Sequence, residues 1–423
     1  MATLSDAGGA PRVAIIGAGA AGLMAAVFAA RAGAETLLVE RTAEGGRKVL
    51  ISGGGRCNIL PSESDETRFV TDSSRNSLRK ILRGWPLHEQ VYFFEKEIHL
   101  PLAKEDGTGK LFPASQRARD VRDGLLREAR AQGTKLYAQA LVTDIAPTDG
   151  GWTVAVAGAP ALRVDAVIIA TGGLSVPKTG SDGSGFAFAR KLGLKVNDTY
   201  AALTPVTADS PRFNALAGIT MPVSITARDA QRSAAARDAF LFTHRGYSGP
   251  AVLDVSHVLV RAGDARRSDA HLLVQWTEIP EEEWTQRLRN TLPGTAHGVL
   301  RRELPERLAT ALCAHAGVDP ARTLSQLRKD ERRRLLDALL RCELPWTGHE
   351  GYRVAEVTGG GVDLAEVDPR TMESRRHPGI FFCGEVLDVF GPIGGYNFQW
   401  AWVTGRAAGR GAALACGREV RYH

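Results

Sequence analysis

Two short, uninterrupted apolar runs near the start of the chain flank a longer stretch rich in alanine. The runs Val13–Ile16 and Thr36–Val39 have the length of buried strands. The stretch between them continues to about Ala32 and is followed by Gly33, the residue type that most often follows the end of a helix. This order predicts a strand, a helix and a second strand, which together form the repeating unit of an α/β fold.

The pattern of apolar positions changes several times along the rest of the chain. Apolar residues at helical spacing predict helices over three ranges: 115–131, 281–343 and 398–415. Other apolar runs predict a strand over 135–145 and a hairpin over 151–173 that returns to the first sheet. Between 196 and 274, short β-type runs alternate with Pro and Gly, which indicates a separate β-rich domain.

Glycines follow the first strand at a spacing that suits a phosphate ligand. Gly17, Gly19 and Gly22 form the pattern G-x-G-x-x-G, and Glu40 stands at the end of the second strand. The first glycine makes a tight turn, the second lets a pyrophosphate approach the backbone, and the third allows close packing of helix on sheet. The N-terminus of the helix attracts the phosphates, and the acid accepts hydrogen bonds from a ribose diol. The unit therefore predicts a dinucleotide site.

Composition limits the partners that we expect. The net charge of +6 could indicate nucleic acid, but the bases are interleaved with acids, as in 328–341, which is typical of a solvated helix face. We therefore expect a small-molecule substrate and no nucleic-acid partner. The uncharged run Val13–Ala30 imitates a membrane span, yet it is mostly Ala and Gly, and its glycines belong to the phosphate motif. We expect no membrane segment, and the oligomeric state stays open.

The five cysteines are far apart. They stand at 57, 313, 342, 383 and 416, without a C-x-x-C pair. This spacing favours neither a metal site nor a disulfide framework, so we expect free thiols, no bound metal and a cytoplasmic protein. Disulfide reductases need a second thiol close to the first, but Ser62 stands five residues after Cys57. We therefore expect Cys57 to be a packed side chain near the cofactor rather than a catalyst.

A loop rich in glycine and cations follows the first unit. Arg47, Lys48 and Arg56 can meet phosphate charge, while the glycines at 53–55 keep side chains away from a flat ring. In this position, such a loop is typical of an extended dinucleotide that continues past its pyrophosphate.

Four segments carry a resemblance to a known family. The sequence GRKVLISGGGRCN (46–58) resembles the FAD-binding half of the glutathione-reductase-like flavoproteins and, more closely, the BaiN-like family of FAD-dependent oxidoreductases. That family includes a bile-acid-pathway flavin reductase and L-aminoacetone oxidase. VIIATGG (167–173), the segment 241–256 and the segment 357–409 are similar to further motifs of the family.

The resemblance implies a Rossmann-like FAD-binding domain of the glutathione-reductase type in two parts. A β-barrel-like domain and a small helical insertion would be inserted between the parts. The domain boundaries that follow are 1–195 and 358–423 for FAD binding, 196–277 and 344–357 for the β-rich substrate domain, and 278–343 for the helical insertion.

The resemblance, together with the motifs, also implies the cofactor contacts. Glu385 would hold ribityl hydroxyls, and the N-terminus of the last helix would point at the flavin. The expected FAD-binding residues are Gly17, Gly19, Ala20, Ala21, Gly22, Glu40, Arg41, Arg47, Lys48, Ser52, Gly54, Gly55, Arg56, Cys57, Asn58, Val142, Ala170, Thr171, Gly172, Gly384, Glu385, Gly394, Gly395, Tyr396 and Asn397.

Catalysis would rest on the flavin and a few side chains. His244, inside FTHRGYSGP, is the candidate for a substrate-side acid–base or orienting group, and the alternative is a structural role at the edge of the β-barrel-like domain. Tyr396 and Asn397 are expected to touch flavin or substrate. The sequence contains no second strand–GxGxxG–helix unit. If NAD(P)H is a transient reductant, it must therefore enter the substrate cleft.

These observations predict an FAD-dependent oxidoreductase that transfers hydride between the flavin and either NAD(P)H or a small amine-like or enone-like substrate. Oxygen or an organic acceptor would reoxidise the flavin. Two alternatives stay open: a flavin-dependent tRNA-modifying enzyme, and a flavin-binding sensor without turnover. The sequence does not name the substrate.

Overall fold

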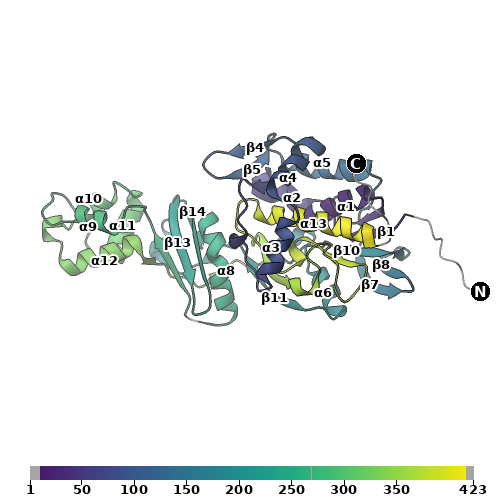
Figure 1. Cartoon of the computed structure of the whole chain (residues 1–423). Coiled ribbons are helices and arrows are strands. Elements are labelled where there is room, and N and C mark those ends of the chain that lie inside the picture. The colour runs from purple at the N-terminus through teal and green to yellow at the C-terminus, as the bar shows by residue number, and fades with distance from the viewer. Residues whose placement is uncertain (1–9, 268, 416–423) are drawn as a thin grey trace, which may run out of the picture. The chain divides into compact units, whose positions relative to one another are not determined.

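A computed structural model describes residues 10–267 and 269–415, which divide into two compact units (Figure 1). Unit 1 contains the described residues up to Thr199 together with those from Val357 onward, and unit 2 is Tyr200–Glu356. The helical segment expected at 278–343 therefore shares a compact unit with the β-rich segment. None of the helices in the described ranges is long and apolar enough to cross a membrane.

A parallel sheet of five strands forms the centre of unit 1. Its order is β20-β10-β1-β2-β6, and neighbouring strands pair in parallel. The strands are β1 (Arg12–Ile16), β2 (Glu35–Val39), β6 (Lys135–Tyr137), β10 (Ala166–Ile169) and β20 (Ile380–Phe382). The middle strand β1 is fully buried from Val13 to Ile15 because its two neighbours flank it and helices cover the sheet. This Rossmann-type sheet confirms the predicted α/β fold class.

Two helices from opposite ends of the chain pack side by side in unit 1. Helix α1 (Ala20–Arg31) follows β1, and α13 (Tyr396–Ala415) lies against it in Figure 1. Glycines permit the close approach, because a Cβ at Gly405 would lie 2.5 Å from Ala21 O and one at Gly409 would lie 2.4 Å from Ala25 O. The N-terminal ends of both helices are thereby held in one rigid core.

Smaller elements surround this core. The remaining helices of unit 1 are α2 (Arg47–Ile51), α3 (Arg75–Arg83), α4 (Leu87–Tyr92), α5 (Ala118–Ala131) and α6 (Ser184–Lys191). Its outer strands are β3 (Leu60–Pro61), β4 (Leu102–Glu105), β5 (Lys110–Pro113), β7 (Val142–Thr148), β8 (Gly151–Val156), β9 (Leu162–Val164) and β19 (Val357–Val362). β11 (Val196–Ala202) runs across the sequence boundary between the units.

Unit 2 is built on an antiparallel sheet in the order β17-β16-β13-β14-β15-β12-β18. The strands are β12 (Val206–Thr207), β13 (Thr220–Arg228), β14 (Ser233–Thr243), β15 (Gly246–Ser248), β16 (His271–Gln275), β17 (Cys342–Glu343) and β18 (Gly348–His349). The helices are α7 (Pro211–Asn214), α8 (Pro250–Asp264), α9 (Glu281–Arg287), α10 (Ala296–Leu300), α11 (Glu306–His315) and α12 (Lys329–Leu340). Phe242 stacks on Trp276 with ring centroids 5.6 Å apart, which places Trp276 in the core of this unit.

Two secondary-structure predictions need correction. The strand predicted over 135–145 is two strands in different sheets, because Gln139 turns the chain with a positive φ of 56°. The backbone N–H of Ala140 then bonds to Glu40 O at 2.9 Å. Helix α8 was not predicted, although Pro250 occupies its first turn, a position that proline favours.

Candidate cofactor site

The turn between β1 and α1 is shaped by two glycines that packing requires. Gly17 has a φ of +101°, and a Cβ there would lie 2.6 Å from Ala170 O. A Cβ at Gly22 would lie 1.9 Å from Gly17 O. These approaches bring the turn against the end of β10, where Ala170 N donates to Ile16 O at 2.9 Å.

Gly19 differs from its two neighbours in the motif. It is the N-cap of α1, with extended backbone at φ −75° and ψ −170°, and a Cβ there would meet no atom of the chain within 4 Å. The first turn of α1, which includes Ala20 and Ala21, contains no acidic residue, and no side chain caps it. Open space beside uncapped N–H groups is what a pyrophosphate needs, so this end of α1 fits the cofactor.

Glu40 is buried at the end of β2, with 7% of its surface exposed. One carboxylate oxygen accepts from Ala18 N at 2.8 Å, and the other accepts from Thr42 N at 2.7 Å and Thr42 Oγ1 at 2.6 Å. A carboxylate has about four lone-pair sites, so it can still accept from a ribose hydroxyl. Glu40 thus fixes the turn between β1 and α1 and keeps capacity to accept from a diol. The next residue, Arg41, pairs with Asp182.

The loop after β2 is held by an arginine that the sequence reasoning missed. Arg122 in α5 is 5% exposed and donates to Glu44 Oε2 at 3.0 Å and to Gly45 O at 3.1 Å. Gly46 N donates to Ala18 O at 2.7 Å, so the loop lies against the start of α1. Arg47, the first residue of α2, is exposed.

Lys48 takes part in a network that the sequence reasoning also missed. Its Nζ lies 2.6 Å from Glu385 Oε2 and 2.5 Å from Ser175 Oγ. Ser175 Oγ donates to Glu385 Oε1 at 2.8 Å, and Thr358 N donates to the same oxygen at 3.0 Å. A Cβ at Gly173 would lie 2.7 Å from Glu385 Oε1, so only glycine leaves room for this contact. Lys48, which was predicted to bind phosphate, and Glu385, which was predicted to bind the ribityl hydroxyls, therefore form an ion pair with each other.

The glycine turn after α2 has the backbone that its composition suggests. Gly53, Gly54 and Gly55 have φ values of 55°, 67° and 85°, and a Cβ at Gly54 would meet nothing within 4 Å. A flat ring could therefore approach this backbone. Ser52 Oγ donates to Val49 O at 2.7 Å, and Ser52 O accepts from Cys57 N at 3.1 Å, which closes the turn.

Cys57 is completely buried and lies in the left-handed region with a φ of 60°. Burial raises the pKa of its thiol to about 12, because the apolar surroundings disfavour the thiolate. The thiol is therefore protonated at neutral pH and is a poor nucleophile. Arg56 beside it pairs with Glu105 at 2.8 Å and lies 4.3 Å from the centroid of the Phe112 ring, so its charge already has partners.

Two stretches predicted to contact the flavin meet in the structure. The Asn58 amide, oriented to satisfy both its ends, accepts from Gly395 N at 3.1 Å. Trp402 Nε1 donates to Ile59 O at 2.9 Å, and a Cβ at Gly395 would lie 2.4 Å from Leu60 C. The segment after the glycine turn is thus bound to the start of α13, although the two are far apart in the sequence.

Tyr396 and Asn397 begin α13, after Gly394 with its φ of 122°. Asn397 bonds both backbone groups of Gly391, at 2.8 and 2.9 Å, so it closes the preceding turn. Tyr396 is 5% exposed, and its hydroxyl accepts from Arg68 Nη1 at 2.9 Å and donates to Glu63 O at 3.3 Å. Burial raises the pKa of this phenol, which stays neutral.

The remaining predicted contacts fall in three places. Thr171 and Gly172 follow β10, and Gly384 follows β20 with a φ of +80°. A Cβ at Gly384 would lie 2.7 Å from the Cβ of Ala21, which places this turn against the start of α1. Val142 is buried in β7, in the outer sheet formed with β8 and β9.

His244 lies in unit 2, in the exposed turn between β14 and β15. The neighbouring Arg245 lies 3.8 Å from Glu350. His244 and the predicted FAD contacts thus belong to different units of the chain.

Comparison with known proteins extends over nearly the whole chain. A family model described as HI0933-like protein Rossmann domain matches residues 11–411. The ribosomal RNA dihydrouridine synthase of Escherichia coli (strain K12) is 35% identical over 412 residues, which cover 96% of this chain and 97% of that protein. The Haemophilus influenzae protein of the same name is 32% identical over 409 residues, covering 93% and 96%. The 3-dehydro-bile acid delta(4,6)-reductase of Clostridium scindens is 30% identical over 413 residues, covering 95% and 99%.

Proposed function

Because this chain belongs to the HI0933-like protein Rossmann domain family, and is thus a flavoprotein oxidoreductase, we propose that it reduces a carbon–carbon double bond conjugated with a carbonyl group. The proposed substrate is a uridine of ribosomal RNA. Both points go beyond the family assignment. The proposal departs from the expectation of no nucleic-acid partner, and it differs from the tRNA-modifying alternative in naming ribosomal RNA as the substrate.

The main support for the proposal is that the names of three relatives describe the same type of reaction. A dihydrouridine synthase and a delta(4,6)-reductase of a 3-dehydro compound both add hydrogen across a carbon–carbon double bond. In uridine and in such an enone, the double bond is activated by a carbonyl, so hydride adds to one carbon and a proton to the other. The two RNA-directed relatives are the more similar in sequence, which favours RNA as the substrate.

The residues of unit 1 supply positions for FAD. The open N-terminus of α1 at Gly19 would bind the pyrophosphate, Glu40 would accept from the adenosine ribose, and the turn 53–55 would lie against the ring. Bound FAD supplies two-electron hydride chemistry. The Lys48–Glu385 pair holds α2 and the turn after β20 in fixed positions, so that both are ready for the cofactor.

A reduction of this kind also consumes one proton per double bond. Tyr396 is the proposed proton donor of unit 1, because burial keeps its phenol protonated and Arg68 orients the hydroxyl; the proton would have to leave its hydrogen bond to Glu63 O. His244 stays the proposed donor of unit 2. NADH or NADPH would deliver the hydride equivalents.

The test combines flavin spectra with an RNA product assay. The purified protein should be yellow, and one of the two nicotinamide cofactors should bleach it without oxygen. Unmodified rRNA transcripts should then restore the oxidised spectrum, with mass spectrometry of digested nucleosides showing uridine that has gained two hydrogen atoms. An enone should serve as the small-molecule control.

Three outcomes would contradict the proposal. Reoxidation by enones but not by RNA would assign a small-molecule reductase. Bleaching by amines would assign an oxidase. Bound FAD that no donor reduces would favour a sensor.

A further inference from the structure

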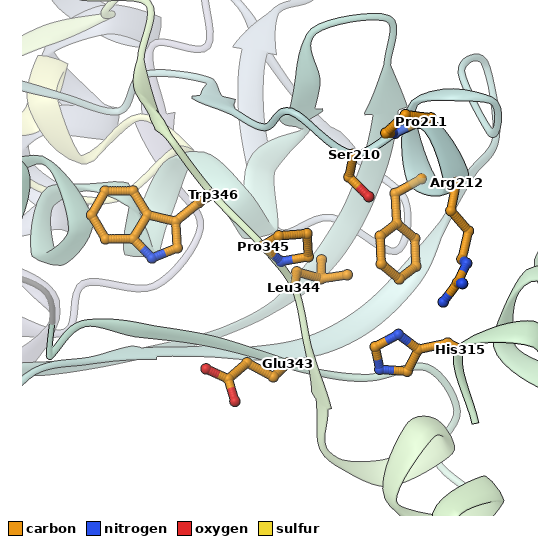
Figure 2. A pocket seen from close by; sticks show the side chains of 9 residues that line it. Ser210, Pro211, Arg212, His315, Glu343, Leu344, Pro345 and Trp346 are labelled. Carbon is orange, nitrogen blue, oxygen red and sulfur yellow. The ribbon is translucent and has the colours of Figure 1, made fainter. Parts of the chain in front are cut away.

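Unit 2 contains a groove that the cofactor site does not explain. Its volume is about 970 Å³, at the upper end of the range of about 300–1,000 Å³ found for ligand pockets. Figure 2 shows that α7, the end of α11 and the segment after β17 contribute its walls. The side chains that matter for the argument are Arg212, Phe213, His315, Pro345 and Trp346.

The walls of the groove offer flat surfaces in fixed positions. The exposed ring of His315 lies against the buried ring of Phe213, with centroids 5.7 Å apart, and Phe213 is in turn anchored by stacking on Phe242. On the other side, Trp346 Nε1 donates to Ala270 O at 3.0 Å, which fixes the indole next to Pro345. Such surfaces accept the faces of nucleobases.

The groove contains one cation, Arg212, and one carboxylate, Glu343. Within residues 10–267 and 269–415, no carboxylate forms an ion pair with Arg212, whose exposed side chain lies beside His315 in Figure 2. Glu343 also lines the groove, but its Oε1 lies 2.6 Å from His271 Nδ1. Burial and the positive charge of Arg212 lower the pKa of His315, so its imidazole is neutral at pH 7 and presents an uncharged aromatic face.

We infer that this groove binds an unpaired segment of the RNA substrate, with bases against His315 and Pro345 and a phosphate at Arg212. The inference rests on the proposed function, since it names a contact of the same substrate. RNA-modifying proteins recognise unstacked bases by stacking and their phosphates by cations, which are the two surfaces that the groove combines.

The test measures the affinity of the FAD-loaded protein for a fluorescein-labelled single-stranded RNA over a series of KCl concentrations. Arg212→Ala should weaken binding about tenfold and should reduce the slope of log affinity against log salt by about 0.7, the value for one phosphate contact. His315→Ala should also weaken binding about tenfold without changing the slope, because stacking is lost and no charge is removed. His315→Phe should restore the affinity.

Arg333→Ala is the matched control, because Arg333 is an exposed arginine of the same unit outside the groove, and it should leave affinity and slope unchanged. Thermal unfolding verifies that each variant is folded. If the wild type forms dihydrouridine in RNA but both Ala variants bind RNA normally, the groove inference is overturned and the proposed function stands. If the wild type neither binds nor reduces RNA, both fail. If Arg212→Ala changes only the KM for NADPH, the groove serves a free dinucleotide and the RNA inference is overturned.

Discussion

Gly19 and Gly22 belong to one motif, but substitution by alanine should affect the stability of the protein differently at the two positions. At Gly22, a Cβ would lie 1.9 Å from the backbone oxygen of Gly17, and a backbone atom cannot move without shifting the end of β1. Overpacking costs about 1–3 kcal/mol, so Gly22→Ala should lower the Tm of the FAD-free protein by roughly 2–4 °C per kcal/mol. At Gly19, the Cβ would meet no atom of the chain, and φ is already suitable for alanine. Gly19→Ala should therefore leave this Tm unchanged, or raise it slightly because the unfolded chain loses freedom.

For FAD affinity, in contrast to the Tm, the substitution at Gly19 should have the larger effect. The Cβ at position 19 would fill the space beside the N-terminus of α1, and a helix terminus contributes about 0.3–2 kcal/mol to a bound anion. We expect Gly19→Ala to weaken FAD about tenfold and Gly19→Val to weaken it further, as 1.4 kcal/mol corresponds to about a factor of ten. Fluorescence titration of FAD-free protein measures the affinity, and scanning fluorimetry measures the Tm. Wild-type FAD affinity in Gly19→Val would refute the position of the pyrophosphate, and a wild-type Tm in Gly22→Ala would refute the packing argument.

Three further predictions test the interior of the site. Glu40→Ala should lower the free energy of unfolding in urea by about 1–3 kcal/mol for each buried N–H left without an acceptor, and Glu40→Gln by less; equal effects would contradict the proposed contacts. In the native protein, Cys57 should not react with a thiol reagent at pH 8, because its thiol is buried and, with a pKa of about 12, stays protonated there, whereas urea should expose it to reaction; rapid native labelling of the peptide that contains Cys57, identified by mass spectrometry, would show that this site is open. Lys48→Ala and Glu385→Ala should show a coupling of about 0.5–3 kcal/mol in a double-mutant cycle of unfolding, and additive effects would mean that the ion pair is not formed in solution.

The parts of the fold predicted correctly are those in which neighbouring residues determine the structure. The strand, helix and strand from β1 to β2 follow from apolar runs and glycines within thirty residues, and the structure has them within one or two positions. The errors occur where one local feature acts against the pattern. Gln139 breaks a β-type run by adopting a positive φ, and Pro250 begins a helix inside a segment that appears β-rich.

The contacts inside the candidate site could not be predicted because they join distant positions. Lys48 and Glu385 are 337 positions apart, and neither sequence neighbourhood indicates that the two charges pair with each other. Ser175 and Thr358 have no distinctive motif of their own, and their roles follow only from the fold. The one available signal was Gly173, since a glycine next to a strand end often permits close approach of another group.

The predicted effects of substitutions differ between the two units: those in unit 1 concern FAD affinity and stability, and those in unit 2 concern the substrate. The residues that fix the glycine turn, the ion pair and the start of α13 contact one another within unit 1, so changes to them should alter FAD affinity or the stability of that unit. His244 and the groove at Arg212 belong to unit 2, and changes to them should alter the affinity for the proposed substrate. Measurements of FAD affinity and of substrate affinity therefore report on different sets of residues in this chain.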